Sequence, residues 1–302
     1  MQEIRRSGTW GSALTSDEFA AIRSVGFEPA GQVLGACVYN IGYTGGYACP
    51  GAWGTSWGYG TPMPARTTTQ VSSRAGYGSF APLVQAMYEA RHKALDRMTA
   101  ECEELGGHGV VGVRLTIGSF PAGGLEFKAI GTAVRAPGVP PVSAWASRGK
   151  RQKRPFTSDL SGQDFAKLIM KGWVPAGLAL GISLGSRHDD WLTVGQTRWG
   201  AGNAEVVGYT ELVNDARHDA RMQLERDVTR LGGEGVVIAT MEMRVREREC
   251  PVQEGRRDHI VEATTIGTAI AKFSDAEQRH TGPTLAVMSL DPQRRQAARI
   301  RI

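Results

Sequence analysis

The sequence predicts an α+β protein made of two tandem copies of one small domain, each with a mixed or antiparallel sheet and one long amphipathic helix. Three observations support this prediction. Short motifs recur in the same order in both halves of the 302-residue chain. Each half has one long segment with apolar residues at helical spacing, and each half closes with two β-rich segments. The predicted order of elements in each copy is therefore α-β-α-β-β.

The repeat consists of three blocks that keep their order while the spacing between them changes. The paired segments are 19–20 and 165–166, 90–92 and 216–218, and 130–133 and 266–269, which lie 146, 126 and 136 residues apart. Twenty extra residues in the first copy precede the long helix, and ten extra in the second precede the last strand. Such changes of length are tolerated in surface loops, so the repeat predicts one shared scaffold with different loops.

Each copy is expected to open with a short helix capped by Ser16 or Ser161, which ends near Gly26 or Gly172. A strand near 33–39 follows in the first copy. The face of each long helix that should be buried consists of Leu83, Met87, Ala90, Ala94, Met98, Cys102 and Leu105, and of Val213, Ala216, Ala220, Leu224, Val228 and Leu231. The closing β segments are 109–117 and 126–134, and then 235–245 and 260–270.

The predicted domain boundaries follow from composition. The segments are a first domain at 1–136 with a Gly/aromatic insertion at 40–80, a Pro/basic linker at 137–157, a second domain at 158–273 and a basic tail at 274–302. The insertion carries aromatic side chains that are candidates for binding a partner: Tyr43, Tyr47, Trp53, Trp57 and Tyr59. The linker carries five basic side chains: Arg148, Lys150, Arg151, Lys153 and Arg154.

Composition narrows the classes of function. The 35 basic and 30 acidic residues give a net charge of +5, much of it in the linker and the tail, which argues against a nucleic-acid-binding surface on the folded domains. No apolar run approaches the roughly 20 residues that a membrane-spanning helix needs, and the N-terminus lacks an apolar signal core. We therefore expect a cytoplasmic protein. The four cysteines lie far apart and predict neither a disulfide framework nor a zinc knuckle.

The helix-turn-strand block resembles a known family. The residues that carry the resemblance are Ala90-Arg91, the segment 105–113 (LGGHGVVGV) and the segment 130–134 (IGTAV). They are similar to the YbjQ family, which is labelled heavy-metal-binding. The resemblance implies a small α+β domain that assembles into rings, pentameric in members of the family, with no established enzymatic activity. We therefore expect a homo-oligomeric ring of two-domain chains. Because this chain has two copies and an insertion, the number of chains in its ring does not follow directly from the pentamers of the family.

The repeated double glycines predict helix ends. Gly106-Gly107 and Gly232-Gly233 follow the long helices, at the negative end of the helix dipole. A phosphate loop would need the opposite end, so these glycines are interpreted as C-caps.

Candidate metal ligands are few. Only His92 and His218 are paired across the copies, and each could meet further histidines only through oligomerisation. No cysteine is repeated: Cys37 aligns with Ser183, and Cys102 aligns with Val228, which predicts a core position for Cys102. The histidines are accordingly interpreted as helix-surface or interface residues, with a metal site as the alternative.

Arg91 and Arg217 fall inside the apolar stripe of their helices on a helical wheel, where a charge needs a partner. The repeated acids Glu126 and Glu262 are the candidates, as one Arg-Glu pair per copy or as a pair across a subunit boundary. The alternative is an arginine whose head reaches water.

No repeated nucleophile-base pair or carboxylate pair predicts an enzyme. His188-Asp189-Asp190 is interpreted as solvated charge in a variable loop of the second copy. The leading hypothesis is a non-enzymatic, ring-forming structural or adaptor protein with an unknown protein partner and no cofactor. The alternatives are a metal- or small-ligand-binding module and nucleic-acid binding through the basic linker.

Overall fold

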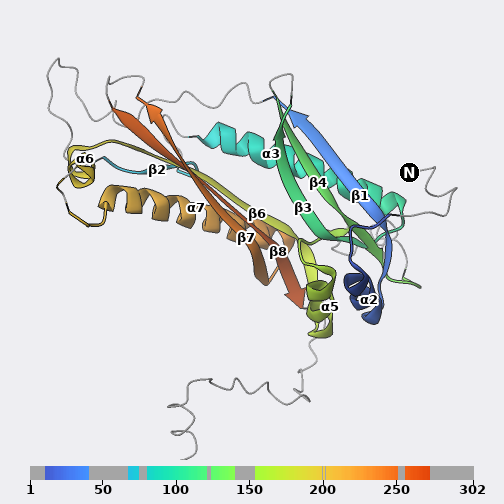
Figure 1. Cartoon of the computed structure of the whole chain (residues 1–302). Helices are drawn as coiled ribbons and strands as arrows, with labels where there is room; N and C mark the ends of the chain where they lie inside the picture. The colour runs from blue at the N-terminus through green and yellow to red at the C-terminus, as the bar shows by residue number, and fades with distance from the viewer. Residues whose placement is uncertain are drawn as a thin grey trace, which may run out of the picture.

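The computed structural model describes residues 11–40, 67–74, 80–120, 124–139, 154–198, 200, 202–250 and 256–272. The predicted α+β class is confirmed (Figure 1). The first half, residues 11–139, contains α2 (Ser16–Ser24), β1 (Glu28–Tyr39), β2 (Gln70–Val71), α3 (Ala81–Glu104), β3 (Gly109–Ser119) and β4 (Leu125–Arg135). The second half, residues 154–272, contains β5 (Phe156–Thr157), α5 (Gly162–Met170), β6 (Trp173–His188), α6 (Trp191–Thr197), α7 (Val207–Leu231), β7 (Gly235–Glu249) and β8 (Arg257–Lys272).

The described strands form two four-stranded sheets. The first sheet has the order β1-β4-β3-β5, and the second has the order β2-β6-β8-β7. Figure 1 shows that the two sheets come together near α2 and α5 and separate toward their other ends. No described helix is long and apolar enough to cross a membrane.

Both sheets pair their strands in the same register. β1 and β4 carry an irregularity between Pro29 and Gly31, and β6 and β8 carry one between Pro175 and Gly177. A second pair of register shifts lies on the neighbouring strands, between Val111 and Arg114 and between Ile238 and Thr240. The repeated sequence motifs therefore occupy equivalent positions in the two sheets.

Each long helix lies directly on its own sheet because a glycine faces it. A side chain at Gly35 would collide with the backbone of Ala94, and one at Gly181 would collide with the backbone of Ala220. The predicted apolar face of α3 is buried except for Leu83 and Leu105, which are partly buried, and Cys102 is fully buried as its alignment with Val228 predicted.

The helix ends agree with the sequence at most positions. Ser161 caps α5 through the amide of Asp164, and Gly106 and Gly232 have φ values of +69° and +76° at the ends of α3 and α7. The left-handed C-cap predicted for both double glycines is confirmed. The prediction of Ser16 as the first cap is wrong by one residue: Thr15 caps α2, because it forms a reciprocal capping box with Glu18.

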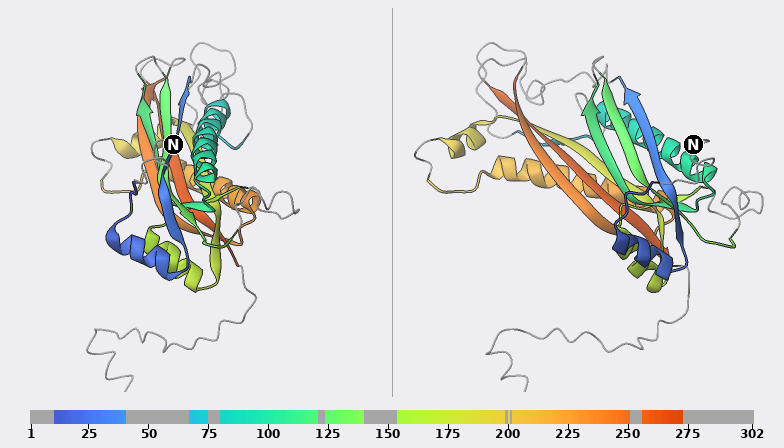
Figure 2. Two further views of the ribbon diagram at one scale, coloured as in Figure 1. Left: turned by 90° about the vertical axis from the view of Figure 1, so that its right-hand side faces the viewer. Right: turned by 45° about the vertical axis from the view of Figure 1, so that its right-hand side comes forward.

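The layers alternate between sheet and helix. One face of α3 packs on the first sheet, and its other face packs on β6 of the second sheet. α7 covers the opposite face of the second sheet. Figure 2 shows α2 and α5 side by side below the sheets, where Ile22 and Phe165 are fully buried in one cluster.

The two halves exchange short strands. β5, at the end of the predicted linker 137–157, pairs in parallel with β3 of the first sheet. β2, inside the predicted insertion 40–80, pairs with β6 of the second sheet. The predicted linker and the predicted insertion thus each contribute one short strand to a sheet. Tyr43, Tyr47, Trp53, Trp57 and Tyr59 and the tail 274–302 lie outside the described residues.

Candidate functional site

Arg91 lies buried between the two sheets, with 5% of its surface exposed. Its guanidinium carbon is 5.9 Å from the centre of the Phe127 ring. Burial lowers the pKa of this guanidinium, and the carboxylate of Glu262 in β8 is the strongest opposing influence. Nη1 of Arg91 is buried and has no hydrogen-bond partner among the described residues. Arg91 therefore lies over an aromatic ring of the first half and within the electrostatic influence of an acid of the second half.

Two of the predictions about the arginines are wrong for the single chain. Glu126 forms an ion pair with Lys128 at 2.9 Å, so it is not the partner of Arg91 in its own copy. Arg217 is exposed rather than inside a buried stripe. The physical reason is that α3 is covered on two sides and α7 on one, which a helical wheel does not reveal.

The edge of β6 that faces the first half is closed by side chains. The hydroxyl of Tyr88 accepts a hydrogen bond from the amide of Ile182 at 2.8 Å and donates one to the carbonyl of Leu180 at 3.2 Å. Burial raises the pKa of Tyr88 to about 12, so this hydroxyl stays neutral. The other amides of this edge bond to Thr157, Asp227 and Ser72. An edge closed by side chains in this way has its backbone donors satisfied.

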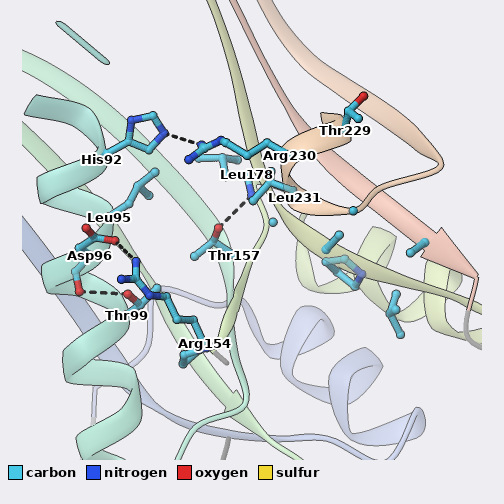
Figure 3. A pocket seen from close by; sticks show the side chains of 17 residues that line it. His92, Leu95, Asp96, Thr99, Arg154, Thr157, Leu178, Thr229, Arg230 and Leu231 are labelled. Atoms are coloured by element: carbon cyan, nitrogen blue, oxygen red, sulfur yellow. Dashed lines mark hydrogen bonds and ion pairs between the residues drawn. The ribbon is translucent and has the colours of Figure 1, made fainter. Parts of the chain in front are cut away.

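A cavity of about 600 Å³ lies at the seam between the halves (Figure 3). It is bounded by α3, the end of the linker, the start of β6 and the end of α7. Arg154 enters it and pairs with Asp96 at 2.7 Å, while Arg230 pairs with Asp227 at 2.5 Å. Because both arginines are already ion-paired, we interpret the cavity as a gap between the two halves and not as an anion-binding site.

His92 and His218 are not brought together. Nε2 of His92 lies 2.9 Å from Nη2 of Arg230, and its ring stacks on Tyr88. His218 is exposed on α7, twelve residues before Arg230, which is about 18 Å along a helix. Within one chain these two histidines do not share a site.

A second group of polar residues lies at the far end of β6. His188 and Asp258 are register partners on β6 and β8, and Nδ1 of His188 is 2.7 Å from Oδ1 of Asp258, both side chains being fully buried. The interpretation of His188-Asp189-Asp190 as solvated charge is wrong, because His188 at the end of β6 and Asp190 at the N-cap of α6 are both buried.

Cys250 joins this pair. One donor atom each from His188, Cys250 and Asp258 lies within 4.8 Å of the others, and all three residues are buried. An imidazole, a thiol and a carboxylate are a donor set that suits zinc or a similar ion. The hydrogen bond between His188 and Asp258 also matches the way a carboxylate orients a ligating histidine. Sequence reasoning missed this trio, since its members come from three strand ends that only the register brings together.

The residues next to His188 in the sequence are held by ion pairs and hydrogen bonds. Arg187 pairs with Asp190 and with Glu211, both at 2.9 Å. Burial alone would raise the pKa of Asp190, but hydrogen bonds from Thr67, Thr193 and Arg187 hold it at about 2. Asp190 thereby fastens the segment before β2 and the start of α6 to the end of β6.

Comparisons with known proteins place the sequence among relatives. A family model described as "Putative heavy-metal-binding" matches residues 61–137. An encapsulin nanocompartment protein of Mycobacterium tuberculosis is 29% identical over 273 residues, which is 88% of this chain and 87% of the relative. A UPF0145 protein of Halorubrum lacusprofundi is 41% identical over 70 residues, 23% of this chain and 67% of the relative. A UPF0145 protein of Thermosipho africanus is 41% identical over 58 residues, 19% of this chain and 54% of the relative. No solved structure matches the chain.

Proposed function

Because the chain belongs to the UPF0145 family, as its 41% identity to the Halorubrum relative shows, we propose that it is a non-enzymatic structural protein whose copies assemble into a ring. In this proposal the two halves are duplicated YbjQ-like domains, and the matched register of the two sheets supports the duplication. A ring of five chains is the first stoichiometry to test, since the resemblance implies pentamers.

The observation that carries the proposal is the exposed edge strand β7. It ends the second sheet, and no described strand pairs with its outer edge. Its exposed apolar side chains are Val237, Ile238, Met241, Met243 and Val245, which are between 37% and 60% exposed. A long edge strand with apolar side chains is a template for pairing, and natural proteins cover it. Assembly with another copy supplies such a cover.

The comparison with the Mycobacterium relative supports the same proposal. That relative is named as a protein of an encapsulin nanocompartment, and its similarity extends over 88% of this chain. A role in an assembled structure is therefore suggested for most of the chain rather than for the short matched domain alone.

The test is the mass of the native particle. Size exclusion with light scattering, followed by native mass spectrometry, should give a closed oligomer whose mass is a multiple of the 32.5 kDa chain. A monomer at micromolar concentration would contradict the proposal.

Metal binding is a second candidate function, favoured by His188, Cys250 and Asp258. Elemental analysis of protein purified without chelator should then find about one zinc or similar ion per chain, and Cys250→Ser should lose it. Cys37→Ser is the matched control, because Cys37 is buried elsewhere and the equivalent residue in the second half is Ser183. If the wild-type protein is purified without metal and also fails to bind added zinc, the proposed metal site is wrong.

A further inference from the structure

The contact between the two halves uses one face from each. The first half contributes the side of α3 that carries Tyr88 and Arg91, and the second half contributes the side of β6 that carries Leu180 and Leu184. Because the two sheets share one register and the two long helices align, these four residues each have an equivalent in the other half. The equivalents show what the same contact would look like between two chains.

α3 covers one face of the second sheet. The equivalent face of the first sheet is exposed to solvent. Leu180 and Leu184 are 1% and 7% exposed. Their equivalents, Leu34 and Val38, are 42% and 48% exposed. Two apolar residues on one face of β1 are therefore uncovered where the equivalent residues of β6 are buried by a helix.

The face of the first half that makes the contact also has an open equivalent. Arg91 on α3 is 5% exposed, whereas Arg217 on α7 is exposed. Val111 on β3 is fully buried, whereas Val237 on β7 is 37% exposed. The chain thus buries one copy of the contact and leaves each of its two complementary faces open at opposite ends.

We propose that the first sheet of a second copy of this chain docks on α7 and β7 in the geometry that joins the two halves internally, with Arg217 facing Glu126 of the second copy. Inside the chain, the carboxylate of Glu262 is the acid that most influences buried Arg91, and these four residues are equivalent in pairs. The charges of Arg217 and Glu126 are complementary. The inference rests on the proposed function and names the contact that builds the assembly.

A head-to-tail contact of this kind leaves the same two faces open on every growing oligomer. It is heterologous, so it ends only when a ring closes on itself. Figure 1 shows the two participating parts, α7 and β1, at opposite sides of the molecule, as a head-to-tail contact requires.

The segment before α2 supplies a cover for the edge of β7. Within the chain, Ser158 follows β5 and bonds to Val110 and Val113 of β3 through its backbone, both at 2.9 Å. Its hydroxyl lies 3.0 Å from that of Thr268, and the equivalent Ser12 lies 3.5 Å from Thr132. Ser12 therefore occupies the position of Ser158 in its own half. In the proposed contact, the backbone around Ser12 of the second copy pairs with β7 near Val236.

The open faces differ from the buried ones in polarity, as a contact between separately folded chains requires. Leu95 and Thr99 on α3 are replaced on α7 by Arg221 and Glu225, which form an exposed ion pair. Interfaces between chains that are soluble before they meet are more polar than a protein core. The replacement keeps α7 soluble before a second copy arrives.

Charge reversal tests the contact with the full-length chain. Arg217→Glu and Glu126→Arg should each raise the dissociation constant of the assembly about tenfold or more, because like charges then face each other. The double variant should restore assembly. Arg226→Glu is the matched control, because Arg226 lies on the same helix as Arg217. Its equivalent on α3, Ala100, is exposed and therefore lies outside the internal contact. Native mass spectrometry and light scattering give the readout, with circular dichroism as the check of folding.

Three outcomes separate the two ideas. Rescue by the double variant supports the contact. An assembled wild type that is insensitive to both single reversals keeps the proposed function and overturns this contact. A wild type that stays monomeric overturns the proposed function itself. Where Glu126→Arg does not fold, Glu126→Gln takes its place, and an unchanged dissociation constant for that variant and for Arg217→Glu overturns the contact.

Discussion

The hydroxyl of Tyr88 accepts a hydrogen bond from the amide of Ile182, and so joins the long helix of the first half to the central strand of the second. Tyr88→Phe should lower the free energy of unfolding by about 1–3 kcal/mol, because a buried amide loses its partner. Urea denaturation measures the loss. Tyr39→Phe is the control, since the hydroxyl of Tyr39 bonds to Glu89 at the surface. Equal losses in the two variants would show that the junction does not depend on Tyr88.

The glycines beneath the long helices set how closely each helix approaches its sheet. Gly35→Ala and Gly181→Ala should each destabilise the chain by about 2 kcal/mol or more, because the added methyl meets helix backbone that cannot move aside. Gly118→Ala, in a strand with open space around the added atom, should change stability by less than about 1 kcal/mol. Thermal and urea unfolding measure the change in stability of each variant. A neutral Gly35→Ala would mean that α3 lies farther from β1.

The low pKa of Asp190 makes the second half sensitive to acid. This carboxyl has a pKa of about 2 in the folded chain against an ordinary 3.8. Its stabilising contribution is therefore complete above about pH 4 and is lost as the pH falls toward 2. Asp190→Asn should melt at a lower temperature than the wild type at pH 7, and the gap should narrow below pH 3.5. Asp17→Asn, at an exposed position, should show no such narrowing. A gap that stays constant with pH contradicts the prediction.

The thiol of Cys102 should be unreactive in the native chain. Burial raises its pKa to about 12, so almost no thiolate forms at pH 8. Iodoacetamide should label Cys102 only after denaturation, as measured by mass spectrometry of the peptide. Replacement by valine, the residue at the equivalent position 228, should cost less than about 1.5 kcal/mol. Rapid labelling of the folded protein would contradict the core position.

Local patterns predicted the elements well. The spacing of Ala90, Ala94 and Met98 specifies one buried face, and the glycines at 106 and 232 specify where the long helices end. These signals are contained within a few neighbouring residues. Two-residue strands such as β2 and β5 have no such signal, because their pairing depends on a distant partner.

Tertiary relationships account for what the sequence left undetermined. A helical wheel places Arg91 and Arg217 alike, yet only α3 has a sheet on both sides, so only Arg91 is buried. His188 and Asp258 are 70 residues apart, and their contact depends on the register of β6 and β8. An Arg-Glu ion pair was predicted for Arg91, but none is formed with a described residue, and the acid that most influences its charge, Glu262, comes from the other half.

The exchange of β2 and β5 has a consequence for cooperativity. The sheet of each half contains one short strand from the other half. Neither sheet is therefore whole when the other half is lost. Melting one half removes an edge strand from its neighbour, and the two should unfold as a single calorimetric transition rather than as two. A gene cut between the halves would yield two fragments that are each incomplete. When the two fragments are mixed, they would have to associate with each other before either fragment could be stable.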